Sequence, residues 1–157
     1  MRLYHGTNCN FDKINLSVSH NKRDFGKGFY LTTDRTQAEE WAGKMMDRYG
    51  GDGIFVYEYE WNEKSPLKYK SFEHAAKDWL LFVKENRIKG GIQHNYDVVR
   101  GKVADDTVAL TISLLVDGTY TVEETISRLE PDKLKDLVSF HTEKALDSLT
   151  FIQKHTY

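Results

Sequence analysis

Two aromatic residues and two glycines in the N-terminal part of the chain have the types and spacing to hold a flat, cationic ring. Tyr30 follows the glycine-punctuated run Phe25-Gly26-Lys27-Gly28, and Trp41 stands eleven positions later. Aromatic faces above and below such a ring would supply stacking and cation–π attraction of about 0.5–2 kcal/mol each. Gly6 and Gly28 have no Cβ, so they would let the backbone approach the ring closely. The pattern therefore predicts a binding site for a planar cation.

Each of these residues also has a purely structural interpretation. His5, at the end of a short predicted strand, would be satisfied by local hydrogen bonds, and Tyr30 and Trp41 would be core aromatics. Phe25-Gly26-Lys27-Gly28 would be a phosphate cradle, but it lacks the Walker pattern and the helix that should follow at once. We favour the binding interpretation because His5-Gly6-Thr7 and the glycine–aromatic strand occur together and in order.

Composition and charge exclude several classes of protein. The 157 residues, 39% hydrophobic and 13% aromatic, suffice for one domain with a proper core. A net charge of −2, from 22 Lys and Arg against 24 Asp and Glu, argues against broad electrostatic capture of nucleic acid. Cys9 is the single cysteine, which excludes internal disulfides and four-cysteine metal sites, and the six histidines lack metal-ligand spacing. We therefore expect one domain over residues 1–157 and no metal.

The sequence also bears on location. No stretch approaches the ~20 apolar residues of a membrane span. The N-terminal run Met1–Asn8 has no charged-then-apolar signal segment. We expect a soluble, cytoplasmic protein without membrane contact.

Hydrophobic periodicity and capping signals predict short strands mixed with helices. Strands are expected at residues 2–5, 29–32, 54–61, 96–99, 102–104 and 137–141. Helices are expected from Thr33 or Asp34 to Gly50-Gly51, at 71–87, 122–129 and 143–149, and from Pro131 in a first turn. The apolar run 108–116 fits either a helix or a buried strand. On the strand 54–61, alternation places four aromatics on one inner face: Phe55, Tyr57, Tyr59 and Trp61. Without a regular βαβ alternation, the fold class is α+β.

Three segments together resemble the ADP-ribosyltransferase fold, in its diphtheria-toxin and poly-ADP-ribose-polymerase branch. Leu3-Tyr4-His5-Gly6-Thr7 resembles the first motif, and Phe25-Gly26-Lys27-Gly28-Phe29-Tyr30-Leu31 resembles the glycine-rich second motif. Gln37-Ala38-Glu39-Glu40-Trp41 falls where the polymerases carry a second stacking aromatic. Two further segments, 96–106 and 139–146, resemble an uncharacterised bacterial family of small proteins assigned to this fold.

The resemblance implies two small, mainly antiparallel sheets that form an NAD cleft, with flanking helices. It implies that His5 hydrogen-bonds a ribose hydroxyl and that Tyr30 and Trp41 sandwich nicotinamide. The remaining residues implied to bind NAD are Gly6 at the amide, Thr7 at the adenosine ribose, and Gly28 and Phe29 beside the ring. Arg23 and Lys27 flank this pocket and are candidates to meet the NAD pyrophosphate.

The acceptor side departs from the polymerase pattern. The glutamate of the third motif would fall at Leu137, or at Asp136 if the register slips by one. Leucine cannot accept a hydrogen bond, so transfer of a single ADP-ribose is expected rather than chain growth. Ala38 replaces the serine that holds the nicotinamide amide in the polymerases. Asp97, Asp105 and Asp106 are further candidates for a carboxylate pocket that meets the acceptor or a divalent ion, although such acids are usually solvated turn residues.

The resulting hypothesis is a mono-ADP-ribosyltransferase that cleaves NAD+ and modifies a macromolecule, either protein, RNA or DNA. Cleavage needs little acid–base work, because nicotinamide is a good leaving group and positioning dominates. Small free-standing members of this fold in bacteria are often toxins or phage-defence effectors paired with an antitoxin. The first alternative is a degenerate domain that binds ADP-ribose, NAD or a partner without catalysis, motivated by Leu137 and Ala38. RNA 2′-phosphate transfer to NAD would need basic residues in the late motifs, and His141 is a poor substitute.

Overall fold

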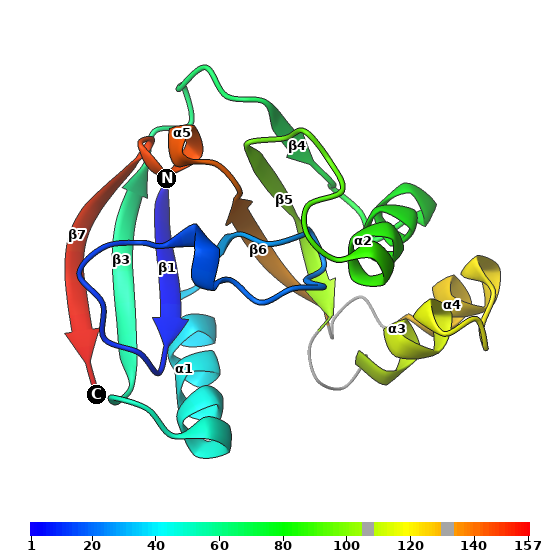
Figure 1. The fold of residues 1–157 in the computed structure, drawn as a ribbon, viewed down its shortest axis with the longest axis horizontal. Helices are drawn as coiled ribbons and strands as arrows, with labels where there is room; N and C mark the ends of the chain where they lie inside the picture. Colours follow the sequence, from blue (N-terminus) through cyan, green and yellow to red (C-terminus); the bar gives the residue numbers. More distant parts are fainter. Residues whose placement is uncertain (105–108, 130–133) are drawn as a thin grey trace.

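The computed structural model describes residues 1–104, 109–129 and 134–157, and its fold is α+β as predicted. Seven strands form one mixed sheet in the order β4-β5-β6-β2-β1-β3-β7 (Figure 1). The strands are β1 (Arg2–Thr7), β2 (Phe29–Thr32), β3 (Phe55–Trp61), β4 (Tyr69–Ser71), β5 (Val98–Ala104), β6 (Leu134–Phe140) and β7 (Leu149–Thr156). The helices are α1 (Arg35–Tyr49), α2 (Lys77–Lys89), α3 (Ala109–Val116), α4 (Val122–Arg128) and α5 (Glu143–Leu146), with a 3-10 turn η1 (Leu16–Val18).

The sheet is single, where the resemblance implied two, but it consists of two halves with a narrow junction. Strands β1 and β2 are paired only at Tyr4 and Thr32, whereas β1 and β3 are paired along the whole of β1. Figure 1 shows β1, β3 and β7 on one side and β4, β5 and β6 on the other. The pairing is antiparallel except between β4 and β5, so the expectation of mainly antiparallel strands is confirmed.

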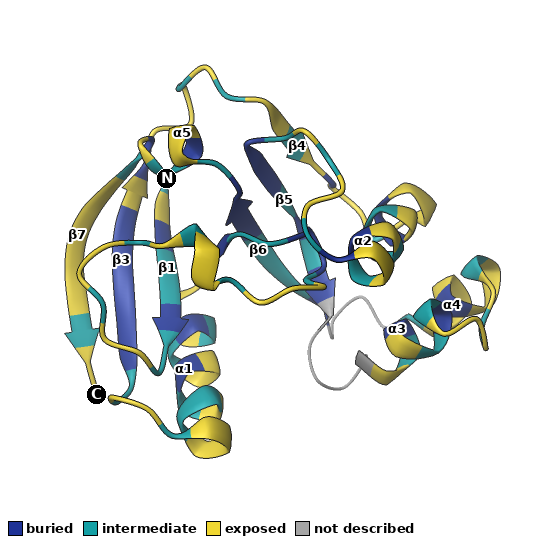
Figure 2. Cartoon of the chain, viewed as in Figure 1, coloured by how far each residue is buried: buried dark blue, intermediate teal, exposed yellow. Residues whose placement is uncertain are grey.

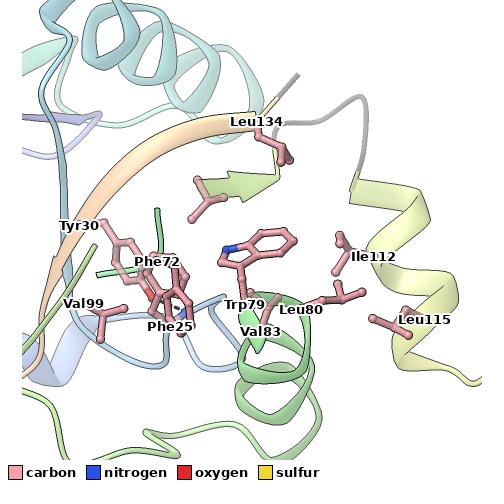
Figure 3. Close-up of a cluster of buried hydrophobic side chains, with 11 residues drawn as sticks. Phe25, Tyr30, Phe72, Trp79, Leu80, Val83, Val99, Ile112, Leu115 and Leu134 are labelled. Atoms are coloured by element: carbon pink, nitrogen blue, oxygen red, sulfur yellow. Dashed lines mark hydrogen bonds between the residues drawn. The ribbon is translucent and has the colours of Figure 1, made fainter. Parts of the chain in front are cut away.

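Two apolar clusters stabilise the fold. The first gathers around the fully buried Trp79 of α2 and includes Phe25, Tyr30 and residues of α3 (Figure 3). The indole nitrogen of Trp79 donates to the Lys102 carbonyl at 2.6 Å, which satisfies its buried polar atom. The second cluster includes Leu3, Phe29, Val138 and the aromatic residues of β3. Figure 2 shows the buried strands β3, β5 and β6 within a more exposed periphery.

Helix α1 begins where its capping signal predicts. The Asp34 side chain accepts a hydrogen bond from the Thr36 N–H at 2.9 Å, and Gly50 ends the helix with a φ of 66°. Ala38 and Ala42 are its buried residues. These small side chains let α1 lie close against β1, beside the junction of the two sheet halves.

Strand β3 is buried more completely than its alternation predicts. Phe55, Tyr57, Tyr59 and Trp61 belong to the second cluster as expected, but Val56 and Glu58 on the other face are buried too. The Glu58 carboxylate pairs with Arg2 and lies 2.8 Å from His155 Nε2. These two hydrogen bonds lower the pKa of Glu58, so a charged residue is accommodated on this face.

Several predicted boundaries are wrong or fall outside the described residues. The helix expected from residue 71 begins at Lys77, because Tyr69–Ser71 form β4 and the Phe72 N–H continues its ladder to the Arg100 carbonyl at 2.8 Å. The helix expected over 143–149 ends at Leu146, and β7 follows. The ambiguous run 108–116 contains the helix α3. Pro131 and the turn 105–106 lie outside the described residues.

Candidate functional site

The junction between the sheet halves joins the two predicted motif residues. If the Tyr4–Thr32 register continued, Gly6 would stand opposite Tyr30, but the two strands stop pairing there. Instead, the Nδ1 atom of His5 lies 2.7 Å from the Tyr30 carbonyl oxygen. The His5 side chain therefore bonds the Tyr30 carbonyl, which would accept from a backbone N–H of β1 if the strands continued to pair.

The environment of His5 fixes its charge and its tautomer. Its ring centroid lies 4.2 Å from that of Phe29 and 6.0 Å from that of Phe11. Burial lowers the pKa of His5 to about 4, against the opposing effect of the hydrogen bond to Tyr30, and the Arg23 charge lowers it further. His5 is therefore neutral at pH 7. Since a carbonyl can only accept, Nδ1 carries the proton, and Nε2 is left as an acceptor with no partner among the described residues.

Tyr30 is held rigidly by a turn of the chain that precedes it. Its hydroxyl donates to the Gly26 carbonyl at 2.6 Å and accepts from the Phe25 N–H at 3.0 Å. Burial raises the pKa of Tyr30, so the phenol stays neutral. The guanidinium carbon of Arg23 lies 4.2 Å from the Tyr30 ring centroid. A face of this ring thus holds a planar cation, the type of group that the sequence predicts for it.

Arg23, a candidate to meet a pyrophosphate, covers the Tyr30 ring beside which that group was expected. Its role at a pyrophosphate stays a prediction. The side chain of Lys27, the other candidate, forms no hydrogen bond or ion pair with the described residues, while its carbonyl accepts from His141 Nδ1 at 2.7 Å.

Gly6 is explained by helix packing. A Cβ at Gly6 would lie 1.9 Å from the carbonyl oxygen of Ala38, so the absence of a side chain lets α1 rest directly on β1. This contact accounts for the glycine without a ligand. Trp41, further along the same helix, is 42% exposed and has no ring contact with Tyr30 within the part of the chain that the structure describes. Two rings that hold a third between them do not touch each other, so the sandwich of nicotinamide by Tyr30 and Trp41 stays a prediction.

Gly28, Phe29 and Thr7 lie around the junction. A Cβ at Gly28 would come within 2.7 Å of His141 Nδ1, and the Ser19 hydroxyl bonds both the N–H and the carbonyl of Gly28 at 2.9 Å. Phe29 packs in the second cluster beside His5, as expected. Thr7 ends β1, and its hydroxyl accepts from the Cys9 N–H at 3.1 Å.

A buried polar network behind Tyr30 was missed by the sequence analysis. His141 Nε2 lies 2.7 Å from the Ser139 hydroxyl, and its ring lies 4.6 Å from that of His94, measured between centroids. His94 Nε2 lies 2.8 Å from the Phe25 carbonyl. Burial lowers the pKa of His141 to about 4 and also lowers that of His94. The alternation of Ser139 and His141 at the end of a strand was the only signal in the sequence.

The described acceptor-side candidates each have partners within the fold. Asp136 pairs with Arg100 at 3.3 Å, and Leu137 packs against the first cluster. Asp97 is buried and accepts from the Lys68 N–H and the Thr142 hydroxyl, at 2.9 and 2.7 Å. Burial raises the pKa of Asp97, but these hydrogen bonds outweigh it, and the pKa is lowered. Asp105 and Asp106 lie outside the described residues.

The described residues contain no group of three or more His, Cys, Asp or Glu side chains arranged to hold a metal ion. No helix among residues 1–104, 109–129 and 134–157 is long and apolar enough to cross a membrane.

Comparison with known protein families matches residues 1–151 to a family described as "Protein of unknown function (DUF3990)". No curated protein and no solved structure matches the chain.

Proposed function

The chain belongs to the DUF3990 family over residues 1–151, and for this member we propose NAD cleavage with transfer of one ADP-ribose to a macromolecule. The observation that carries the proposal is the 2.7 Å contact between His5 Nδ1 and the Tyr30 carbonyl. It joins the two motif residues and leaves His5 Nε2 as a neutral acceptor beside the junction. A ribose hydroxyl is a suitable donor for that atom.

The contact between the Tyr30 ring and the Arg23 guanidinium supports the proposal. Nicotinamide attached to ribose is a flat cation, as is the Arg23 guanidinium that lies 4.2 Å from the ring centroid. In the proposed complex, the nicotinamide ring displaces Arg23 and takes this ring face. Arg23 is then free to meet the negative charge of the pyrophosphate, which is the role that its position in the sequence suggested.

An ADP-ribosyltransferase fold is part of the proposed function. We propose an ADP-ribosyltransferase fold in which NAD binds where β1 and β2 stop pairing, beyond Tyr4 and Thr32. The chemistry requires the chain to orient the ribose and to favour the oxocarbenium-like transition state over the ground state. His5 would orient the ribose, and the buried hydroxyl contacts of Tyr30 would keep its ring from moving.

Transfer of a single unit is favoured by the third-motif position. Leu137 is apolar and packs in the core, and Asp136 is engaged with Arg100. Neither prepares an attached ADP-ribose for further growth. A cytoplasmic toxin or phage-defence effector, paired with an antitoxin, is the biological setting that we propose for such an activity.

A second candidate is a domain that binds NAD or ADP-ribose without cleaving it. The observation that favours it is the direct contact between Gly6 and the Ala38 carbonyl, with no serine hydroxyl for the nicotinamide amide. Binding without chemistry would leave the His5 and Tyr30 contacts intact and would give no nicotinamide release.

The deciding experiment incubates the pure protein with NAD and measures nicotinamide release alongside NAD binding by calorimetry. We expect release by the wild type and a loss of about 100-fold in His5→Ala, because a misplaced ribose costs about that much. His20→Ala, which changes an exposed histidine, is the control and should behave as the wild type. Binding without release in the wild type would support the second candidate, and neither binding nor release would reject both.

A further inference from the structure

A pocket is lined by Phe11, whose ring also lies near that of His5. It has a volume of about 340 Å³ and is bounded by residues 11–14, β3, α5 and β7. Phe11 is the shared wall, because its ring stacks on that of Tyr57 at 4.0 Å and also lies 6.0 Å from the His5 ring. Figure 1 shows the segment after β1 crossing in front of β1 and β3, with α5 near one end of these strands.

The pocket has an aromatic floor with one hydroxyl that is not used by the fold. Tyr57 and Tyr59 of β3 and Phe151 of β7 line it, and the Tyr59 and Phe151 centroids are 5.8 Å apart. The Tyr57 hydroxyl bonds the backbone of Phe11, at 2.8 Å from its nitrogen and 3.0 Å from its oxygen. Tyr59 is only 5% exposed, and none of the hydrogen bonds among the described residues involves its hydroxyl. The hydroxyl is not sealed from solvent, because the one buried side-chain atom without a partner in the described residues is Trp61 Nε1, so a ligand in the pocket can bond it.

The rim of the pocket carries an excess of unpaired acid. Asp12, Glu143 and Asp147 line it, and no ion pair to their carboxylates occurs among the described residues. Two lysines line it as well, Lys13 and Lys154, and the Lys154 ammonium donates to the Asn10 side chain at 2.8 Å. The three carboxylates therefore exceed the two ammonium groups by one charge. Carboxylates around an aromatic floor favour a planar cation and disfavour phosphate groups.

We propose that this pocket binds the guanidinium group of an arginine side chain on a protein partner. A guanidinium is flat enough to stack on the half-exposed Phe151 ring, and its five N–H donors can bond the Tyr59 hydroxyl and the rim carboxylates. A lysine ammonium is a compact point charge and cannot stack in this way. The proposal concerns binding alone and does not depend on NAD cleavage.

The test titrates capped arginine, capped lysine and capped glutamine into the full chain, followed by amide chemical shifts. We expect weak, saturable binding of capped arginine with shifts at residues 11–14, α5 and β7. Capped lysine should bind more weakly, and capped glutamine, which lacks the charge, should not bind. Tyr59→Phe removes one hydroxyl and keeps the ring, and it should weaken arginine binding about tenfold.

Matched charge variants distinguish binding in the pocket from nonspecific attraction to any surface carboxylate. Asp147→Asn should weaken arginine binding about two- to fivefold, as expected for one partly exposed ion pair. Glu85→Gln removes an exposed carboxylate of α2, outside the pocket, and should leave binding unchanged. Unfolding curves of all variants establish that the fold is retained. Equal binding of capped glutamine, no response in Tyr59→Phe, or preferential binding of adenosine monophosphate would each overturn the proposal.

Discussion

Three histidines have the same structural role at the scale of single residues. His5, His94 and His141 each place one ring nitrogen within 2.8 Å of a backbone carbonyl, belonging to Tyr30, Phe25 and Lys27. All three carbonyls lie in the segment 25–30, which carries the glycine-rich motif. Burial lowers the pKa of each histidine, so each is a neutral donor that ties this segment to another part of the chain.

These histidines make stability depend on pH in a defined direction. Two of them have a folded pKa of about 4 against an ordinary value of 6.5. Between those values the unfolded chain binds protons that the folded chain does not, so the free energy of unfolding falls as the pH falls. The slope is up to about 1.4 kcal/mol per pH unit for each histidine. Urea unfolding between pH 6.5 and 5, where most carboxylates stay charged, should show this loss.

The control for the pH effect is a change of one histidine at a time. His141→Gln should reduce the slope by about one proton, although it also lowers the overall stability. His20→Gln, at an exposed position, should leave the slope unchanged. A flat profile in the wild type, or an unchanged slope in His141→Gln, would contradict a neutral, buried His141.

Arg23 gives a second prediction at this scale. Because its guanidinium covers the Tyr30 ring at 4.2 Å, a cationic ring must displace it before binding. Arg23→Ala should therefore tighten binding of N-methylnicotinamide by about three- to thirtyfold, the equivalent of one cation–π contact. Calorimetry measures the change. Lys27→Ala removes a nearby positive charge that does not cover the ring, and it should have a smaller effect. Weaker binding in Arg23→Ala would show that Arg23 assists the ligand.

At the scale of elements, the contact between α1 and β1 depends on a glycine. A Cβ at Gly6 would meet the Ala38 carbonyl oxygen at 1.9 Å, and a backbone atom cannot move aside without shifting the helix. Gly6→Ala should lower the free energy of unfolding by about 1–3 kcal/mol or more, the cost of overpacking. Gly43 lies in the same helix and has nothing within 4 Å of its Cβ position, so Gly43→Ala should be stabilising by about 0.5–1 kcal/mol. Urea unfolding of both variants tests the pair, and a neutral Gly6→Ala would refute the packing argument.

The elements also show which sequence patterns were informative. The cap at Asp34 and the buried Ala38 and Ala42 made α1 predictable, and alternation made β3 predictable. Strand β7 could not be predicted, because it is an edge strand whose side chains are mostly exposed, and so it has no alternation to detect. The expected start of α2 was wrong because Phe72 has helical spacing but packs in the first cluster from an extended segment.

The residues of the candidate site were predictable only where a short motif marks them. His5 and Tyr30 were recognised because short motifs mark them, and their contact follows from the pairing of β1 with β2. The Arg23–Tyr30 stack and the Ser139–His141 contact are local in sequence, but neither was predictable. Arg23 lies in an irregular segment before β2, and hydrophobic alternation gives no sign of a polar pair at the end of a strand. The pocket beyond Phe11 depends on β7 and was missed together with it.

At the scale of the whole molecule, the edge strand β7 extends beyond the residues that match the family. The match ends at residue 151, while β7 continues to Thr156 and pairs with the whole of β3. Without β7, β3 would become an edge strand, Tyr59 would lose its Phe151 contact, and Glu58 would lose His155. The C-terminal strand is therefore part of the folded unit.

This gives the last prediction. A chain that stops after Ser148 should lose cooperative thermal unfolding and aggregate, because it exposes both the aromatic face and the unpaired backbone of β3. Removing Tyr157 alone loses its hydroxyl contacts with Arg35 and Glu39 and its backbone hydrogen bond to the Ile54 carbonyl at 3.0 Å, and should lower stability by about 1–2 kcal/mol at most. Thermal unfolding with sedimentation analysis distinguishes the two truncations. If the chain ending at Ser148 stayed monomeric and unfolded cooperatively, the half of the sheet built on β1 and β3 would be stable without its edge strand.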